Sequence, residues 1–358
     1  MRNSYAIHRS APLKAFRSEA DAVRAGAWFA ASFLGNAKAL AYCEKSNIEV
    51  RQLSEGINSQ GGVFVPVELM RAIVELRERR GAFRRAAQVL PMANDTAHIP
   101  MRVSGPTAYY VGEGVAPTAT DVILSNIGLA ARKLSIVTNI SNELDEDAAA
   151  DLGDFLAREM AYQFADAEDR AGFLGDGTST YAGQTGITKK LTSTMAGYVL
   201  AASGHNTWGE IDATDLSNLI GALPDYAVPG AAWFCSSKAF AYVFCRLAGV
   251  SGGIVMAPDA TGRLVPHFMG WPVITCSILA GGTNSTDFAA LPMILFGDLS
   301  LAATLGERRG VTITKSDKAP GVFAADQTAF KATQRFHINV HDVGDATNPG
   351  PVVALIGN

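Results

Sequence analysis

The sequence predicts a mixed α+β fold, and three observations carry that prediction. Apolar residues recur every three or four positions from about 150 to 174, as in a long amphipathic helix. Two strand patterns, at 96–103 and 121–140, precede this helix. An alternating pattern, AFKATQRFHINV, lies at 329–340. This order of elements, without an internal repeat, is typical of an α+β protein.

Composition narrows the function classes before any motif is considered. The chain has 358 residues, enough for one to three domains, and its 18% of charged residues and 35 glycines suggest a surface that meets other protein. A net charge of −4 argues against a dedicated nucleic-acid binder. The four cysteines lack zinc-ligand spacing, and no run of residues suits a signal peptide or a bilayer span. We therefore expect no metal, no cofactor and no membrane contact.

The first 65 residues are expected to form an N-terminal arm with one helix. Helical spacing runs from Glu19 to Lys45, and the polar stretch RQLSEGINSQGG that follows is typical of a connector. A further helix is predicted over 67–80, because Pro66 suits its start and Gly81 its end.

The two strand patterns predict an extended hairpin. The sequence between them, SGPTAYYVGEGVAPTATD, is rich in Gly, Pro and Thr, which favours an elaborated tip. Along 121–140 the apolar alternation shifts from Ile127 and Leu129 to Leu134 and Ile136. Such a shift indicates a bulge or bend midway.

The long helix is the clearest element of the sequence. Acidic residues crowd 143–147, where the helix dipole favours negative charge, and Gly175 suits the end of the helix. The glycine-rich GDGTSTYAGQTGI at 175–187 follows a helix and lacks the Lys-Ser or Lys-Thr pair of a phosphate loop. It is therefore interpreted as a turn between rigid elements.

The second half alternates short helices and strands without a catalytic constellation. A helix after Asp212, the strand AAWFC, a helix over about 237–247 and the strands WPVITC and PMILFGD are predicted. Residues 249–253 read G-x-S-x-G, but a predicted helix precedes Ser251, where a hydrolase needs a strand. His337 and His341 would be about 13 Å apart on a strand, too far to share a metal. We therefore expect a protein that is not an enzyme.

A run of arginines marks residues 71–85, and three interpretations are open. The run comprises Arg71, Arg77, Arg79, Arg80, Arg84 and Arg85. It could form a solvated helix face with internal pairs to Glu75 and Glu78, since charges three or four residues apart on a helix are neighbours. It could form salt bridges between subunits, with Asp145, Glu146 or Glu159 as partners. The third interpretation is contact with nucleic acid.

Seven segments carry a family resemblance, in this order: GGVFVP at 61–66, YYVGEG at 109–114, KLSIVTNISNELDEDA at 133–148, FLGDGTSTYAGQTGI at 173–187, AAWFCSS at 231–237, MGWPVIT at 269–275 and ILFGDL at 294–299. In order and spacing they resemble the major capsid proteins of tailed bacteriophages, which share the Hong-Kong-97-type fold. The match spans residue 61 to about 356.

The resemblance implies a domain organisation. Residues 1–65 would be the N-terminal arm, and 66–204 the first part of a peripheral domain. That part would hold an extended hairpin loop at 91–131, a spine helix at about 145–174 and a glycine-rich loop at 175–187. An axial domain would occupy 205–325, and 326–358 would return to the peripheral domain with a C-terminal strand.

The resemblance also implies function and partners. The chain would self-assemble into hexamers and pentamers of an icosahedral phage head, in the virion, after assembly in the cytoplasm of a host bacterium. Its partners would be a scaffolding protein, a portal, a decoration protein and, on the inner face, packaged double-stranded DNA. The residues expected to contact other subunits are Arg77, Arg80, Arg84, Arg85, Tyr109, Tyr110, Glu113, Glu146, Gly175, Asp176 and Gly177.

Two departures from the family qualify these expectations. Some members crosslink their shells through a lysine of the extended loop, but 91–131 contains no lysine, so no crosslink is expected. No long coiled-coil scaffold segment is visible in 1–60, so scaffolding is either a separate protein or already removed. Two alternatives stay open: an encapsulin-like bacterial compartment with the same fold, and a serine hydrolase that uses Ser251.

Overall fold

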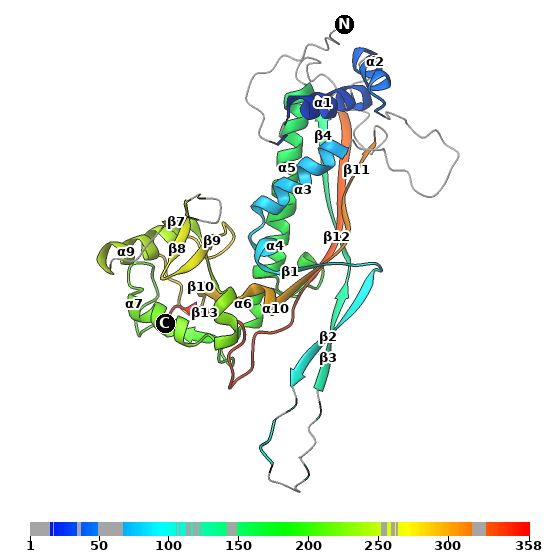
Figure 1. Cartoon of the computed structure of the whole chain (residues 1–358). Helices are drawn as coiled ribbons and strands as arrows, with labels where there is room; N and C mark the ends of the chain where they lie inside the picture. Colours follow the sequence, from blue (N-terminus) through cyan, green and yellow to red (C-terminus); the bar gives the residue numbers. More distant parts are fainter. Residues whose placement is uncertain are drawn as a thin grey trace.

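The structure is a computed structural model that describes residues 15–16, 18–33, 37–48, 67–104, 106, 108–111, 116, 121, 123–141, 149–251, 256–258, 262, 264–316 and 327–358. Its shape is elongated (Figure 1). A compact part built on a seven-stranded sheet lies to one side, a long helix rises beside a four-stranded sheet, and a two-stranded hairpin projects in the direction opposite to that helix.

The long helix α5 (Ala149–Leu174) is the axis of the upper part. Its buried side chains include Ala157, Met160, Ala161 and Phe164, which pack against α1 (Glu19–Phe33) and α3 (Val67–Arg80). The helix ends at Leu174, so its predicted end at Gly175 is confirmed. A Cβ at Gly175 would lie only 2.5 Å from the Ala171 carbonyl oxygen, so close approach of the backbone requires glycine here.

The four-stranded sheet lies against these helices. Its order is β1 (Gln88–Pro91), β11 (Ala303–Ser316), β12 (Gln327–Val340) and β4 (Arg132–Ser141), and β12 is antiparallel to both long neighbours. Alternate residues of β12, such as Phe330 and Ala332, are buried in the core with α5. We call the opposite side the open sheet face; its members include Lys133, Ser135 and Val137 of β4 and Lys331, Thr333 and Arg335 of β12.

The seven-stranded sheet forms the centre of the compact part. Its order is β5 (Tyr198–Leu200), β13 (Val352–Ile356), β10 (Pro292–Gly297), β6 (Ala232–Cys235), β9 (Trp271–Thr275), β8 (Leu264–Phe268) and β7 (Met256–Pro258). The helix α7 (Ala213–Gly221) packs on it. A second helical segment runs through α8 (Ser237–Ala239), the π-helical η4 (Phe240–Cys245) and α9 (Arg246–Ser251). Trp208, Trp233 and Phe296 are fully buried in the core of the compact part.

The projecting hairpin consists of β2 (Thr96–Ser104) and β3 (Ile123–Ala130). Within the part of the chain that the structure describes, these two strands pair only with each other. Ala131 separates β3 from β4, and β4 then pairs with β12. The predicted bend is therefore confirmed, but the prediction of one strand over 121–140 was wrong. The two halves belong to different sheets, and each half buries a different apolar set.

The N-terminal region differs from the prediction of one helix. Its described residues form two helices, α1 (Glu19–Phe33) and α2 (Ala37–Lys45). The sequence between them contains Gly35 and Asn36, both weak helix formers. Farther along, α3 has the predicted bounds and the short α4 (Ala82–Ala86) follows Gly81.

The sheets do not follow the predicted boundary at 325/326. β11 lies in the four-stranded sheet, although it was assigned to the axial domain. β13 lies inside the seven-stranded sheet, although it was assigned to the returning segment. The chain crosses between the two sheets three times, after β4, β10 and β12, because each strand finds partners distant in sequence. The remaining short elements are η2 (Ser179–Tyr181), α6 (Ile187–Lys190), η3 (Asp225–Gly230) and α10 (Leu299–Ala302).

Candidate functional site

Two of the predicted contact arginines, Arg77 and Arg84, are buried inside the chain. Arg84 donates to Glu168 with both Nε and Nη2 at 2.8 Å, and its Nη1 donates to Glu307 at 2.8 Å. Arg77 Nη1 lies 3.1 Å from Glu307 and donates to Gln334 at 3.0 Å. Gln334 in turn donates to Glu168, which is fully buried. These five residues form the buried ion network, which joins α3, α4, α5, β11 and β12.

The pairing in this network determines its charge state. Burial alone would lower the pKa of Arg84, but the hydrogen bonds and charges of Glu168 and Glu307 outweigh it and raise that pKa. Burial likewise works against the ionised Glu307, yet Arg77 and Arg84 hold its pKa below the usual range. Arg84 therefore stays charged, and both arginines are paired with carboxylates of the same chain. The prediction that Arg77 and Arg84 contact another subunit was wrong, because both side chains are buried within the chain.

Beside this network, Asp169 joins the long helix to α4. Its carboxylate accepts the backbone N–H groups of Ala82 at 3.0 Å and Phe83 at 2.8 Å, which are free donors at a helix start. Burial raises the pKa of Asp169 to about 6, although these two hydrogen bonds lower it. Cys276 Sγ lies 3.6 Å away, so the same carboxylate also touches the segment after β9.

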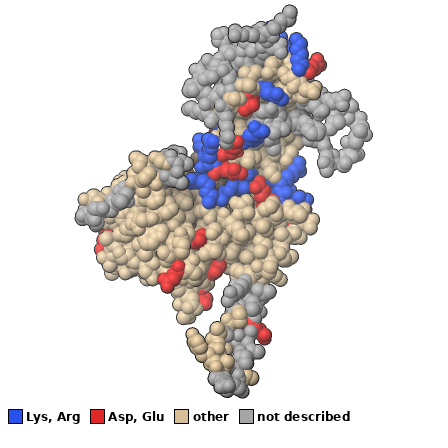
Figure 2. All heavy atoms as spheres, in the orientation of Figure 1, with Lys and Arg blue, Asp and Glu red and all other residues tan. Residues whose placement is uncertain are grey.

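The other arginines of the run are at the surface. Arg80 stacks over the ring of Tyr162, 5.4 Å from its centroid, and Arg79 lies 4.0 Å from Glu75 on the same helix. Arg85 donates to the Gly81 carbonyl at 3.1 Å and is exposed. Figure 2 shows a band of Lys and Arg over α3 and α4, whereas the compact part below carries acidic and almost no basic side chains in this view. Arg80 and Arg85 thus remain available to a partner.

The glycine-rich loop after α5 is a closed turn. Asp176 accepts hydrogen bonds from the Thr178 N–H at 2.9 Å and its hydroxyl at 2.6 Å, and these lower the pKa of Asp176. Gly177 has φ +80°, which favours glycine. A Cβ at Gly186 would lie 2.6 Å from the Phe173 backbone. Glycine here therefore permits tight packing, and the carboxylate is satisfied within the loop.

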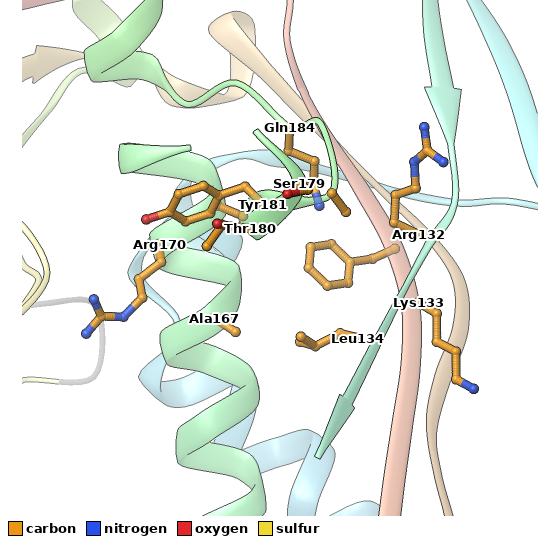
Figure 3. A pocket seen from close by; sticks show the side chains of 12 residues that line it. Arg132, Lys133, Leu134, Ala167, Arg170, Ser179, Thr180, Tyr181 and Gln184 are labelled. Atoms are coloured by element: carbon orange, nitrogen blue, oxygen red, sulfur yellow. The ribbon is translucent and has the colours of Figure 1, made fainter. Parts of the chain in front are cut away.

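A pocket of about 440 Å³ opens between this loop, α5 and the start of β4. Leu134 points into it, and Arg170 and Tyr181 line the helix side (Figure 3). Phe336 also lines the pocket. Arg170 is held by Asp166, 2.7 Å away. The lining includes Arg132, Lys133 and Arg170 but no acid, so the pocket favours an apolar or anionic occupant.

The hairpin leaves aromatic and apolar side chains uncovered near its tip. Tyr110 is fully exposed, Tyr109 is 50% exposed and Val111 47%. Contiguous exposed apolar surface marks an interaction site. The two predicted acids Glu113 and Glu146 lie outside the described residues.

A cluster of His205, Asp212 and Asp215 has its ligand atoms within 4.8 Å of one another. Asp212 and Asp215 form a capping box at the start of α7, and Asp215 also accepts from His205 Nδ1 at 2.7 Å. That hydrogen bond raises the pKa of His205. Helix capping accounts for this cluster without a metal.

The structure also places Ser251 of the G-x-S-x-G motif and the two histidines His337 and His341. Ser251 is the last residue of α9, so a helix precedes it, as the sequence predicts. A hydrolase needs a strand at that position. His337 lies within β12 and His341 just after it, with both rings partly buried. Within the described residues, no helix is long and apolar enough to cross a membrane.

Sequence analysis missed the partners of the buried arginines. Glu168 and Glu307 look like ordinary surface acids in the sequence, and Gln334 stands in an alternating strand. One signal was available: Glu168 falls among small and apolar residues on the buried side of the long helix, between Ala165 and Ala171.

Comparisons with known proteins identify the fold. The capsid of an empty GTA particle has a TM-score of 0.56 at 20% identity, over 88% of this chain and 97% of that one. The holo-SrpI encapsulin of Synechococcus elongatus PCC 7942 has a TM-score of 0.51 at 10% identity, over 88% and 94%. At such identities the likeness shows the fold alone, which is the predicted Hong-Kong-97-type capsid fold.

Sequence comparison assigns the family. Residues 61–344 match the Phage capsid family, and the chain belongs to it. The major capsid protein of Klebsiella oxytoca phage phiKO2 is 24% identical over 295 residues, which are 79% of this chain and 65% of that protein. The chain thus spans slightly less than two thirds of this relative. The predicted family and fold class are confirmed.

Proposed function

We propose that this chain is the major structural protein of a phage head and self-assembles into the hexamers and pentamers of an icosahedral shell. Membership of the Phage capsid family and the capsid fold support this function. The shell encloses double-stranded DNA, and the protein acts without chemistry of its own. Its place is the virion, after assembly in the cytoplasm of the host.

The projecting hairpin is the observation that carries the proposal. A two-stranded ribbon is marginally stable by itself in water. This one extends from the body (Figure 1) and leaves Tyr109, Tyr110 and Val111 exposed near its tip. A surface of this kind becomes buried when many copies associate, because each copy offers both the ribbon and a place for its neighbour's.

The contact residues divide between three regions and one further position, Glu146. The hairpin contributes Tyr109, Tyr110 and Glu113. The loop after α5 contributes Gly175, Asp176 and Gly177, and the α3–α4 surface contributes Arg80 and Arg85. Glu146 precedes the long helix and completes the set. A scaffolding protein, a portal and a decoration protein are the further partners of this function.

Electron microscopy of the purified protein tests the proposal. We expect wild-type protein to form closed shells with hexamers and pentamers. Deletion of Pro106 to Thr118 should leave a subunit with the wild-type circular-dichroism spectrum that forms few or no shells. Wild-type protein that stays monomeric at high concentration would contradict the function. Normal shells from the deletion variant would contradict the role of the hairpin.

The likeness to an encapsulin favours one alternative, a bacterial compartment with the same fold. The two functions differ in the content of the shell. Particles purified from the natural source should contain DNA if the chain is a head protein, and protein cargo if it is a compartment protein. Nuclease-resistant DNA in these particles decides for the head.

A further inference from the structure

The pocket beside the glycine-rich loop is large enough for a small organic molecule. Its volume of about 440 Å³ lies within the range of about 300–1,000 Å³ that is usual for ligand sites. Its floor is the outer surface of a hydrophobic core, in which Phe336 and Ala171 are buried and against which Leu134 packs. The loop side carries the hydroxyl groups of Ser179 and Thr180 (Figure 3). An apolar floor with polar groups at the rim suits a ligand that is apolar at one end and polar at the other.

Gln184 supplies a buried hydrogen-bond donor at this pocket. The side chain is only 4% exposed and lines the pocket, and its Oε1 accepts a hydrogen bond from the Ile338 N–H at 2.9 Å. That bond fixes the amide with Nε2 as its other end, and the amide points toward the pocket (Figure 3). No described residue accepts a hydrogen bond from this Nε2. Buried polar groups are nearly always hydrogen-bonded, so the free donor requires an acceptor oxygen in the pocket.

The charges around the pocket are positive. Arg132, Lys133 and Arg170 line it, and no acid does. Arg132 pairs in register with Phe336, so it projects from the pocket side of β4, whereas Lys133 projects to the open sheet face. Arg170 is already held by Asp166, but Arg132 forms no ion pair with another described residue. Arg132 is therefore the unpaired charge that an anionic group at the rim would meet.

We propose that this pocket binds a small amphipathic carboxylate, with its apolar body against Leu134 and Phe336 and its carboxylate between Gln184 Nε2 and Arg132. An ionised carboxylate only accepts hydrogen bonds, so it satisfies the free donor without adding an unpaired donor of its own. Hydrogen bonds to a charged acceptor are also roughly twice as strong as those between neutral groups. None of the residues predicted to contact other subunits lines the pocket, so this inference goes beyond the shell function.

The pocket can receive such a ligand without a change of the backbone. The Arg132 guanidinium extends away from Leu134 and does not cover the floor (Figure 3). Arg132 is exposed, and exposed side chains change rotamer within nanoseconds, so its guanidinium can turn toward a bound carboxylate. Ser179 and Thr180 are exposed as well, and their hydroxyls can donate to the second carboxylate oxygen. Donors are therefore present on both the loop and β4.

A series of three probes tests the class of ligand. Isothermal titration calorimetry of the full-length subunit with naphthalene-2-carboxylate should show one saturable site, with a Kd below about 1 mM. Naphthalene-2-carboxamide keeps the ring and an acceptor oxygen but lacks the charge, so it should bind at least about tenfold more weakly. Acetate keeps the charge but lacks the apolar body, and it should show no saturation below about 10 mM.

Three variants and a matched control locate the site. Ala167→Leu fills the pocket from α5 with a good helix former, so the affinity for the carboxylate should fall at least about tenfold. Gln184→Glu keeps the acceptor for Ile338 and replaces the free donor with a negative charge, so it should weaken the carboxylate by at least about tenfold and the carboxamide less. Arg132→Gln should weaken the carboxylate about threefold. Lys133→Gln removes the neighbouring charge on the opposite face and should bind as wild type.

Thermal unfolding without probe controls for folding. Each variant should have a Tm within about 4 °C of wild type. Arg132→Gln and Lys133→Gln change exposed positions, so their comparison remains decisive even if an interior variant unfolds.

The outcomes separate this inference from the shell function. Wild-type subunits without saturable binding would overturn it, and so would equal affinities for carboxylate and carboxamide or wild-type affinity in Ala167→Leu. Binding that isolated subunits show and assembled shells lose would also overturn it, because a neighbouring copy would then occupy the pocket. A chain that binds the probe as expected but forms no shells would contradict the shell function alone.

Discussion

Two groups of basic residues in this protein differ in burial and pairing: the buried ion network, and a row of four cations on the open sheet face, Lys133, Arg308, Arg309 and Arg335, which we call the cation row. In the network, Arg77 and Arg84 are almost fully buried and each meets a carboxylate of the same chain. In the cation row, Arg309 and Lys133 are exposed and have no such partner among the described residues. The two regions are close in the fold, since Glu307 of the network directly precedes Arg308 in β11.

The difference shows which charges must be paired for the subunit to fold and which can stay unpaired in a folded subunit. A buried charge must find its counter-charge within the subunit, because removing one partner of a buried pair costs about 3–5 kcal/mol. An exposed charge can remain uncompensated at little cost until a second copy arrives. Changes in the network should therefore lower the stability of the subunit much more than changes in the cation row.

The largest effect is expected from Glu168→Gln. This change keeps the shape but removes the buried carboxylate that holds Arg84 at 2.8 Å, so the free energy of unfolding should fall by about 3–5 kcal/mol. Urea unfolding of the subunit measures it. Glu159→Gln, on the exposed side of the same helix, is the control and should change stability by less than about 0.5 kcal/mol. Equal effects of the two changes would show that the network does not stabilise the subunit.

A smaller effect is expected from pH at Asp169. Its pKa is raised to about 6 in the folded chain, so the folded state binds a proton more tightly than the unfolded state. The resulting stabilisation is complete below the ordinary pKa near 4 and is lost as pH rises through about 6, at up to about 1.4 kcal/mol per pH unit. Asp169→Asn should flatten this dependence in urea unfolding between about pH 4.5 and 7. Asp176→Asn, at an exposed acid whose pKa is lowered, should leave the slope unchanged.

The smallest effect on folding is expected from Arg80→Ala. The change removes the cation–π contact with Tyr162, so unfolding should become easier by about 0.5–1 kcal/mol. Thermal unfolding of the subunit measures this change, and a shell-assembly assay compares association. A stability loss as large as that of Glu168→Gln would contradict the prediction, because exposed and buried arginines would then contribute equally to folding.

Local patterns predicted several elements well. The helix over 67–80, bounded by Pro66 and Gly81, and the end of the long helix before Gly175 were confirmed, because turn and cap residues act within a few positions. β12 was predicted from its strict alternation. β11 was missed, since its bulges around Arg309 interrupt the alternation that would have revealed it.

The candidate site was predicted less completely than the fold. The run of arginines in 71–85 was found, yet the sequence could not separate buried Arg84 from exposed Arg85. That distinction depends on Glu168 and Glu307, which lie 84 and 223 positions away. Tyr109 and Tyr110 are exposed, and their contact with a neighbouring copy remains a prediction.

By itself, the sequence determined the helix and strand periodicities, the helix ends and the family to which the chain belongs. It also determined that the only charged residues of 105–122 are the acids Glu113 and Asp121. Only the tertiary structure decided which arginines are buried, which sheet receives β13, and that Lys133, Arg309 and Arg335 stand in one row. Periodicity and capping depend on neighbours along the chain. Burial and register depend on residues that folding brings together from distant positions.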